Sequence, residues 1–179
     1  MVRTMSRLLQ RQGYAATGLN EVVEQAGAPK GSLYFHFPGG KEQLASESLA
    51  ASGASIRRVI EATLASAESP AAAVQRLAMG LGGALAASGY SEGCPIATVA
   101  LEEATVSEPI RSCSAEAFRS WEAAIAERFV QFGWGPVPAA SAATLILSAL
   151  EGGLILSRAY RSTEPLSAVA AGLAQSLSR

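Results

Sequence analysis

The chain has 179 residues, of which 49% are hydrophobic, with a mean hydropathy of +0.23 and a formal net charge of −1. This length is enough to bury a core, and the apolar excess indicates a surface that meets another subunit. The sequence has no aspartate and a single histidine, which excludes a Ser-His-Asp triad and leaves only Ser-His-Glu formally available. Two cysteines, Cys94 and Cys113, without a Cys-x-x-Cys pair predict no metal site and no cofactor.

Basic residues are concentrated at the start of the chain. Residues 1–41 contain five basic residues against two acidic ones, a net charge of +3, whereas the remainder contains nine against 13, a net charge of −4. The five cations are Arg3, Arg7, Arg11, Lys30 and Lys41. A basic N-terminal segment followed by an acidic remainder is the distribution expected when only the N-terminal segment contacts the phosphates of a nucleic acid.

Apolar residues at helical spacing predict two helices near the start of the chain. The first has its stripe at Val2, Met5, Leu8 and Leu9, and the second at Leu19, Val22, Val23 and Ala26. Thr17 lies just ahead of the second helix, so its hydroxyl is expected to cap the free N–H groups of the first turn. Gly27 is expected to end that helix, because the residue past the last turn often adopts the left-handed conformation.

Pro29 is expected to open a third, short helix over about residues 30–36. Leu33 and then Phe37 point toward the apolar stripe, and the outward face consists of Lys30, Gly31, Ser32, Tyr34, Phe35 and His36. Cations, hydroxyls, phenols and imidazoles donate to phosphate oxygens or to base edges in the major groove. Two short helices with this face are typical of a DNA-reading module, although by pattern alone an ordinary helical hairpin fits equally well.

A longer ordered pattern favours the DNA-reading interpretation. It runs Gly13-Tyr14-x-x-Thr17, then Val22-Val23-x-x-Ala26-Gly27-x-x-Lys30-Gly31-Ser32-Leu33-Tyr34-x-His36-Phe37, and then Lys41-Glu42-x-Leu44. In this order the residues resemble the N-terminal domain of TetR-family transcriptional regulators. The Pro-Gly-Gly-Lys link at residues 38–41 and the later Gly93-Cys94-Pro95-Ile96 segment are similar to the LmrA/YxaF-like subgroup, which responds to small lipophilic or aromatic compounds. The link has three residues between Phe37 and Lys41, where most members have two.

The resemblance implies an all-α protein with a three-helix, helix-turn-helix DNA-binding domain at residues 1–44 and a helical ligand-binding and dimerisation domain at residues 45–179. It also implies a ligand-responsive regulator, usually a repressor, that binds a palindromic operator in double-stranded DNA as a homodimer and is not an enzyme. Two cysteines without a secretory leader predict a cytoplasmic protein. Family members usually carry a further turn and a basic arm ahead of the first helix. Either the start of this sequence is late or the protein lacks the arm, and in both cases we expect some phosphate contacts to be missing.

The predicted DNA-binding residues are Thr17, Lys30, Gly31, Ser32, Tyr34, His36 and Lys41. Thr17 and Lys41 are expected to hold phosphates, and Tyr34 and His36 to contact a phosphate or a base edge. Lys30 and Ser32 are expected to reach into the groove, where Gly31 permits close approach. Leu33 and Phe37 are expected to support the fold.

Past Lys41 the chain has helical spacing throughout, and no β-alternation competes. Helices are predicted at about residues 41–66, from Ser69 and Pro70 onward, and at about 115–132, 139–156 and 165–177. Breaks are expected at Pro109 and at residues 133–138.

The segment 139–156 contains a single charged residue, Glu151, and so could be mistaken for a membrane span. It is shorter than the roughly 20 residues that a bilayer requires, and polar residues and Gly152-Gly153 interrupt it, so we expect no membrane association. A helix that is apolar on most faces must be covered on most faces. We therefore expect this helix and the last one to pair with their symmetry mates in a homodimer, with plain core packing as the alternative.

A small apolar or aromatic effector is expected to bind in the body, where aromatic and soft side chains surround one carboxylate. The candidate lining is Met79, Leu85, Tyr90, Cys94, Glu102, Phe118, Trp121, Ile125 and Trp134, although each of these residues fits a plain core position equally well. Two other functions remain open from the sequence. One is a helical enzyme that uses Glu102 with Glu103 or Glu151, and the other is a helical small-molecule-binding or adaptor protein without DNA binding.

Overall fold

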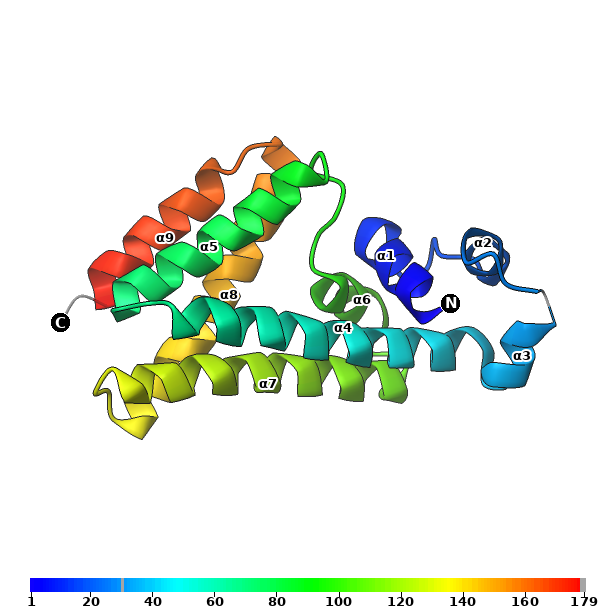
Figure 1. The fold of residues 1–179 in the computed structure, drawn as a ribbon, viewed down its shortest axis with the longest axis horizontal. Helices are drawn as coiled ribbons and strands as arrows, with labels where there is room; N and C mark the ends of the chain where they lie inside the picture. Colours follow the sequence, from blue (N-terminus) through cyan, green and yellow to red (C-terminus); the bar gives the residue numbers. More distant parts are fainter. Residues whose placement is uncertain (30, 178–179) are drawn as a thin grey trace. The chain divides into compact units, whose positions relative to one another are not determined.

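The computed structural model describes residues 1–29 and 31–177, and within these ranges it contains nine helices and no strand (Figure 1). The all-α prediction is therefore confirmed. Contacts between Cα atoms divide the chain into two compact units. Unit 1 comprises Met1–Ser55 and Cys94–Phe118, and unit 2 comprises Ile56–Gly93 and Arg119–Arg179. Unit 1 thus contains residues 45–55 and a later segment, 94–118, in addition to residues 1–44.

That later segment includes α6 (Pro95–Glu103), which packs against α1 (Val2–Gln12). The α1 stripe is buried as predicted at Met5, Leu8 and Leu9, while Ile96 and Val99 of α6 are wholly buried. Apolar surface on one helix is stabilised by the apolar surface that covers it, so α6 belongs to the core of unit 1. A side chain on α6 can therefore contact the N-terminal helices directly.

The turn after α2 (Leu19–Gln25) has the predicted glycine geometry. Gly27 has φ +61°, its N–H donates to the carbonyl of Glu24, and the N–H of Ala28 donates to the carbonyl of Val23. These two bonds make a Schellman motif, which satisfies carbonyls at the helix end. The short helix that follows, α3, runs over Ser32–His36 and so begins later than Pro29 had suggested.

The predicted cap on α2 is wrong. The N-cap residue of α2 is Gly18, which has no side-chain cap, and the Thr17 hydroxyl instead donates to the Gly13 carbonyl over 2.6 Å. Thr17 is fully buried. A helix cap accepts backbone N–H groups through its side-chain oxygen, but the N-cap position of α2 falls to Gly18, so the Thr17 hydroxyl instead closes the preceding turn by donating to a backbone carbonyl.

Unit 2 is built on α5 (Pro70–Ala87), α8 (Pro136–Tyr160) and α9 (Glu164–Leu177), which pack against one another (Figure 1). Ser69 caps α5 by accepting a hydrogen bond from Ala72 N–H at 3.2 Å. Gly153 of α8 allows close packing, because a Cβ there would lie 3.2 Å from Leu166 and 3.3 Å from Val169. Small residues thus let α8 and α9 approach closely within one copy of the chain.

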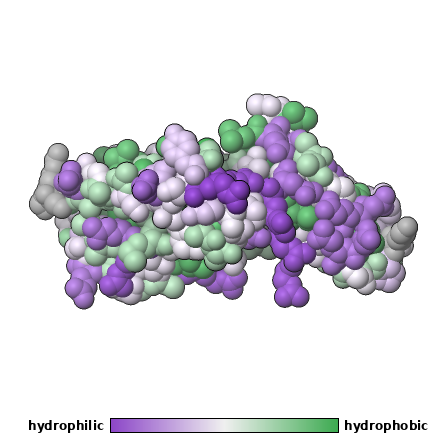
Figure 2. Space-filling view, turned by 90° about the horizontal axis from the view of Figure 1, so that it is seen from above, coloured by the Kyte–Doolittle hydropathy of each residue, from purple (hydrophilic) through white to green (hydrophobic). Residues whose placement is uncertain are grey.

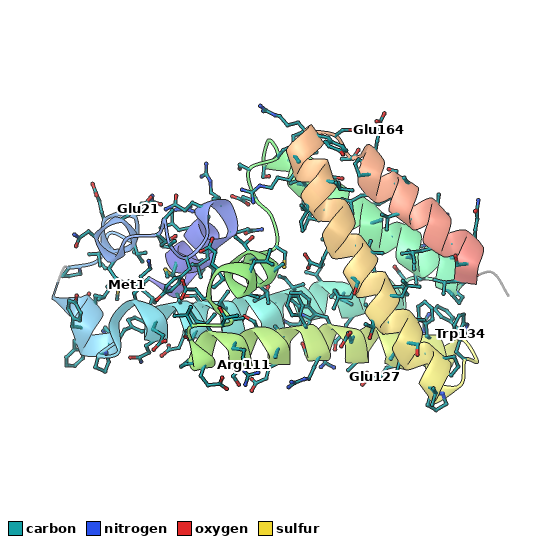
Figure 3. The ribbon with its side chains drawn as sticks, turned by 180° about the vertical axis from the view of Figure 1, so that it is seen from behind. Met1, Glu21, Arg111, Glu127, Trp134 and Glu164 are labelled. Carbon is teal, nitrogen blue, oxygen red and sulfur yellow. The ribbon has the colours of Figure 1, made fainter. Side chains whose placement is uncertain are left out.

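Two long helices contribute to both units: α4 (Gly40–Ala65) and α7 (Glu108–Gln131). The break expected at Pro109 falls just ahead of it, between α6 and α7, and Pro109 itself lies in the first turn of α7, where its missing N–H costs nothing. The aromatic stripe of α7 is buried at Trp121 and Phe129. Trp134 lies in the turn after α7 (Figure 3). Its ring meets that of Phe129 edge to face, with ring centroids 5.3 Å apart.

Helix α8 is 25 residues long, so the expectation that this segment is too short to cross a bilayer is wrong. By length and apolar composition alone it is the one candidate span among the described residues. Its buried residues recur at helical spacing, as in the core helix of a globular protein. They are Ala139, Ala142, Ala143, Ile146, Leu150, Gly153, Leu154 and Ser157.

Candidate nucleic-acid interface

The third helix separates its buried and exposed side chains sharply. Leu33 and Phe37 are 2% and 8% exposed, whereas Tyr34 is 64% exposed and His36 also faces solvent. The buried residues are those predicted to support the fold, and the exposed ones are those predicted to meet a partner. A five-residue helix with this division presents a phenol and an imidazole on a rigidly anchored surface.

Phe35 is the residue of α3 to which the sequence assigned no role. Its ring is 82% exposed and meets His36 in a T-shaped contact with centroids 5.1 Å apart. An exposed phenylalanine cannot donate a hydrogen bond, but it can make apolar contact with the 5-methyl group of thymine. In the sequence, Phe35 could have been identified as a candidate contact residue because it is an apolar side chain at an outward position of α3.

The start of α3 is open to a partner. The Ser32 hydroxyl donates to the Pro29 carbonyl at 2.7 Å, and its oxygen can still accept. A Cβ at Gly31 would meet nothing within 4 Å, so the protein itself does not require glycine there. Lys30, predicted to reach into the groove, lies outside the described residues.

The link between α3 and α4 accommodates its additional residue through glycine. Gly40 has φ +65°, and its N–H donates to the Phe37 carbonyl at 2.8 Å, while the Gly39 N–H donates to Gln43 Oε1 at 2.9 Å. The left-handed conformation at Gly40 costs little without a Cβ. Lys41 then lies with its Nζ 4.2 Å from the centroid of the Tyr14 ring, a cation–π distance.

Glu102, which was expected to line an effector pocket, instead contacts the turn between α1 and α2. From α6, its Oε2 accepts hydrogen bonds from two consecutive backbone amides, those of Tyr14 at 2.7 Å and Ala15 at 2.9 Å. These amides belong to the turn between α1 and α2. Gly13, at the start of this turn, has φ +79°. The carboxylate therefore hydrogen-bonds to the backbone of the N-terminal helices and does not line an apolar pocket.

Further acidic groups surround this turn. The Ser107 hydroxyl donates to Glu42 Oε1 at 2.6 Å, which ties the segment after α6 to the start of α4. Partial burial raises the pKa of the Tyr14 phenol above its usual value, and the charges of Glu103 and Glu42 raise it further. The phenol therefore stays protonated and neutral beneath the Lys41 cation at physiological pH.

The outer surface of α1 and α2 is hydrophilic. Figure 2 shows hydrophilic residues gathered over these two helices, and the exposed side chains of α1 include Arg3, Arg7 and Arg11. The Arg7 guanidinium donates to Gln25 Oε1 at 3.0 Å. Exposed cations on α1 provide a sequence-independent attraction for phosphate.

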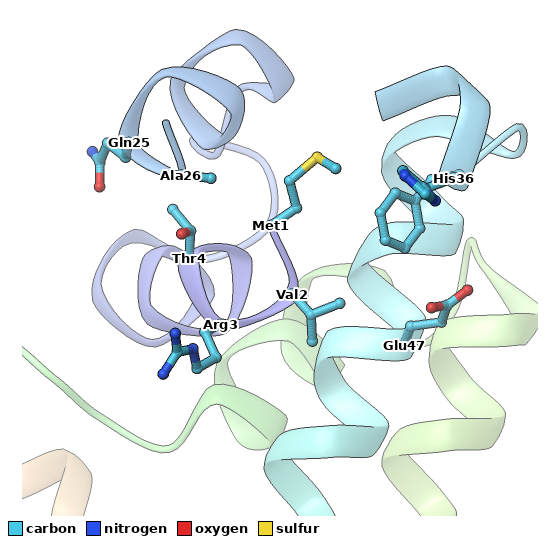
Figure 4. A pocket seen from close by; sticks show the side chains of 9 residues that line it. Met1, Val2, Arg3, Thr4, Gln25, Ala26, His36 and Glu47 are labelled. Carbon is cyan, nitrogen blue, oxygen red and sulfur yellow. The ribbon is translucent and has the colours of Figure 1, made fainter. Parts of the chain in front are cut away.

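A cleft of about 740 Å³ lies between the N-terminal helices and the start of α4 (Figure 4). Arg3 and His36 bring basic groups to its wall, and Glu47 brings an acidic one. The full lining is Met1, Val2, Arg3, Thr4, Gln25, Ala26, His36, Phe37 and Glu47. His36 thus borders both the outward face of α3 and this cleft.

The expected effector lining is divided between the two units. Leu85, Trp121 and Ile125 are buried within unit 2, where Tyr90 and Trp134 are half-buried. Cys94, Glu102 and Phe118 belong to unit 1. Met79 departs from the expectation, since it is 75% exposed on α5. Cys94 Sγ accepts from the Ala97 N–H at 3.4 Å and so caps α6.

Comparisons with known proteins agree with this geometry. Residues 4–47 match the family described as bacterial regulatory proteins, tetR family, and residues 70–172 match the C-terminal domain of LmrA/YxaF-like transcriptional regulators. The chain belongs to the TetR family. This TetR-family protein is a transcriptional regulator with a DNA-binding domain and not an enzyme.

Two curated relatives of this TetR-family regulator come from Bacillus subtilis (strain 168). The HTH-type transcriptional regulator YxaF is 38% identical over 170 residues, which cover 95% of this chain and 89% of YxaF. The HTH-type transcriptional regulator LmrA is 38% identical over 161 residues, which cover 90% and 86% of the two chains. The subgroup resemblance is therefore confirmed.

Solved structures show the same fold at low sequence identity. Regulatory protein TetR from Rhodobacter sphaeroides has a TM-score of 0.87 at 18% identity, covering 97% of this chain and 95% of that one. A cysteine mutant of the TetR-family regulator CifR, complexed with 26-bp double-strand operator DNA, has a TM-score of 0.82 at 21% identity, covering 97% and 93%. The all-helical arrangement is thus shared with a protein whose structure includes DNA.

Proposed function

We propose that this TetR-family regulator is a repressor that binds a palindromic operator as a homodimer and leaves it when a small apolar or aromatic effector binds. The observation that carries the proposal is the division of α3, where Leu33 and Phe37 anchor the helix and Tyr34, Phe35 and His36 face outward. Family membership supplies the DNA-binding domain. The effector, the repressing mode and the dimer are the finer parts of the proposal.

The proposed contacts differ in chemistry. Tyr34 and His36 meet a phosphate or a base edge, and Lys41 meets a phosphate. Gly31, Ser32 and Lys30 approach the groove, as the sequence suggested. Thr17 is left out of this set because its hydroxyl is buried and donates to the Gly13 carbonyl.

The proposed dimer surface lies on α8 and α9. Leu145, Ile155 and Leu156 are exposed at positions of α8 that fall on one face, and Gly152 lies on that face with open space where a Cβ would be. A twofold axis brings the same patch of both copies together, so a self-complementary apolar face suits a dimer. Dimerisation matters because the DNA-binding domains of the two copies must match operator half-sites one helical turn of DNA apart.

The proposed effector site lies in unit 2. The mixture of Trp121, Ile125, Leu85, Tyr90 and Trp134 suits a flat apolar ligand. Such a ligand weakens DNA binding only to the extent that it prefers the conformation that does not fit the operator. Relatives in the LmrA/YxaF-like family support the assignment of a C-terminal regulatory domain.

A gel shift with the duplex from the regulator's own upstream intergenic region tests the proposal. We expect a discrete shifted band that competitor DNA of unrelated sequence does not remove, and loss of the band with one of a panel of aromatic compounds. A protein that binds no more tightly to this duplex than to the competitor would contradict operator binding. If the protein binds the duplex but no compound in a broad panel weakens that binding, only the proposed response to an effector is contradicted.

A further inference from the structure

We propose that Glu102 is a positioning residue for DNA recognition, which fixes the turn between α1 and α2 and thereby holds Tyr14 beneath Lys41. The inference rests on the proposed function, because Lys41 matters only if the chain binds DNA. Glu102 lies 88 residues from Tyr14 in the sequence, far outside the helix-turn-helix. Nothing in the local pattern of residues 1–44 requires it.

The carboxylate is bound as an anion in a small cradle. A single oxygen, Oε2, accepts from both Tyr14 N–H and Ala15 N–H at 2.7 and 2.9 Å. Successive backbone N–H groups in a turn form an anion-binding concavity, and hydrogen bonds to an ionised acceptor are stronger than neutral ones. The geometry therefore orients two peptide planes of the turn at once.

The other carboxylate oxygen lies against Gly13. A Cβ at this position would be 1.9 Å from Oε1 and 2.8 Å from the carboxyl carbon Cδ of Glu102. Gly13 has φ +79° and ψ −174°, a conformation that is essentially restricted to glycine. Glycine thus both shapes the turn and leaves room for the carboxylate.

The turn is connected to the proposed phosphate contact through one residue. Tyr14 donates its amide to Glu102, and its ring lies 4.2 Å from Lys41 Nζ. A cation over an aromatic face loses rotamer freedom, which prepares the ammonium for a phosphate oxygen. Loss of the Glu102 contact frees the Tyr14 backbone, so the ring no longer restrains Lys41.

The contact also joins the two family regions. Glu102 lies in the part that matches the LmrA/YxaF-like C-terminal domain, residues 70–172, and Tyr14 lies in the part that matches the TetR N-terminal domain, residues 4–47. Both residues belong to unit 1. The region that matches the C-terminal domain therefore supplies a carboxylate, that of Glu102, to the DNA-binding helices.

The role is positional because the turn is not what holds unit 1 together. Helices α1 and α6 pack against each other, and Met5, Leu8 and Leu9 of α1 and Ile96 and Val99 of α6 are buried in the apolar core. Glu102 itself is exposed, so water screens its hydrogen bonds and they add little to the free energy of unfolding. Removing the carboxylate leaves the apolar core unchanged.

The test compares the full-length protein with Glu102→Ala, Glu102→Gln and Glu103→Ala. Glu103→Ala is the matched control, since it removes the same charge from the end of the same helix without touching the two amides. Three quantities are measured for each protein: affinity for the upstream duplex over a range of salt concentrations, amide hydrogen exchange at Tyr14 and Ala15, and the melting temperature. Operator binding by the wild type is established first.

We expect Glu102→Ala to bind the duplex about 3- to 10-fold more weakly, with a smaller salt slope as Lys41 loses its contact. Exchange at Tyr14 and Ala15 rises, and the melting temperature barely changes. Glu102→Gln retains affinity, because one amide oxygen can accept both bonds. Glu103→Ala binds DNA at least as tightly as the wild type. In a Lys41→Ala background, Glu102→Ala has little further effect.

Wild-type affinity and exchange in Glu102→Ala would overturn the inference and leave the proposed function standing. A parallel fall of affinity and melting temperature, which Glu102→Gln does not restore, would also overturn it, because the residue would then be structural. A wild-type protein that binds no duplex would overturn the proposed function and this inference together.

Discussion

Gly13 and Glu102 are fitted to each other, since a Cβ on Gly13 would fall 1.9 Å from Oε1 of the glutamate. The left-handed φ of +79° at Gly13 is the second reason why only glycine suits the position. One residue comes from the end of α1 and the other from α6, so the shape of the turn depends on a partner distant in the sequence.

Gly13→Ala should destabilise the protein by about 1–3 kcal/mol, because alanine is strained at this backbone conformation and also meets the carboxylate. Chemical denaturation measures the free energy of unfolding. In a Glu102→Ala background the same change should cost less, since the collision is gone and only the backbone strain remains. An equal cost in both backgrounds would show that the carboxylate moves aside freely.

Lys41→Ala should reduce the slope of log K against log salt concentration by about one unit, because one phosphate contact is lost. Arg57→Ala is the control, since Arg57 pairs with Glu61 at 2.7 Å on the unit 2 part of α4. The slopes come from fluorescence anisotropy of a labelled duplex. An unchanged slope for Lys41→Ala would remove this residue from the interface.

Phe35→Ala should weaken binding while leaving the salt slope unchanged, because an apolar ring neutralises no phosphate. If the ring contacts a thymine methyl group, replacing that thymine by deoxyuridine should weaken binding by the wild type and have no effect on Phe35→Ala. A scan of single thymine-to-deoxyuridine changes in the duplex identifies the position. Equal sensitivity of both proteins at every position would place the ring away from the bases.

Periodicity in the sequence predicted much of the fold. Apolar residues at helical spacing indicated the buried sides of α1, α2 and α3, because burial depends on one local geometric repeat. Leu33 and Phe37 were therefore placed inward correctly, and the outward face of α3 followed from them. Gly27 was also identified correctly, since its left-handed φ depends on the adjoining helix end.

Contacts between distant segments could not be predicted in the same way. Glu102 was interpreted as the one carboxylate of an effector pocket, but the packing of α6 on α1 brings it to the Tyr14 turn. Thr17 was expected to cap α2, yet Gly18 occupies the N-cap position and the Thr17 hydroxyl donates to the Gly13 carbonyl. Hydrogen bonds of short side chains depend on which backbone group is nearest, and sequence spacing does not determine this.

Ile155→Glu should convert the proposed dimer into a monomer, because a charge on an apolar interface between two copies is costly to bury. Val59→Glu is the control, as Val59 is also an exposed apolar residue but lies on α4. Sedimentation velocity measures the mass in solution. The prediction is contradicted by a wild-type monomer at micromolar concentration, or by an Ile155→Glu protein that remains dimeric.

Tyr34→Ala and Leu33→Ala together test the central claim most directly, since these neighbouring residues of α3 face opposite ways. The measurement is affinity for the upstream duplex alongside the free energy of unfolding for each variant. Tyr34→Ala should lose at least about tenfold in affinity with almost unchanged stability, while Leu33→Ala should lose about 2–5 kcal/mol of stability. If Tyr34→Ala binds DNA as the wild type does, or loses stability in proportion to affinity, α3 does not read DNA through its outward face.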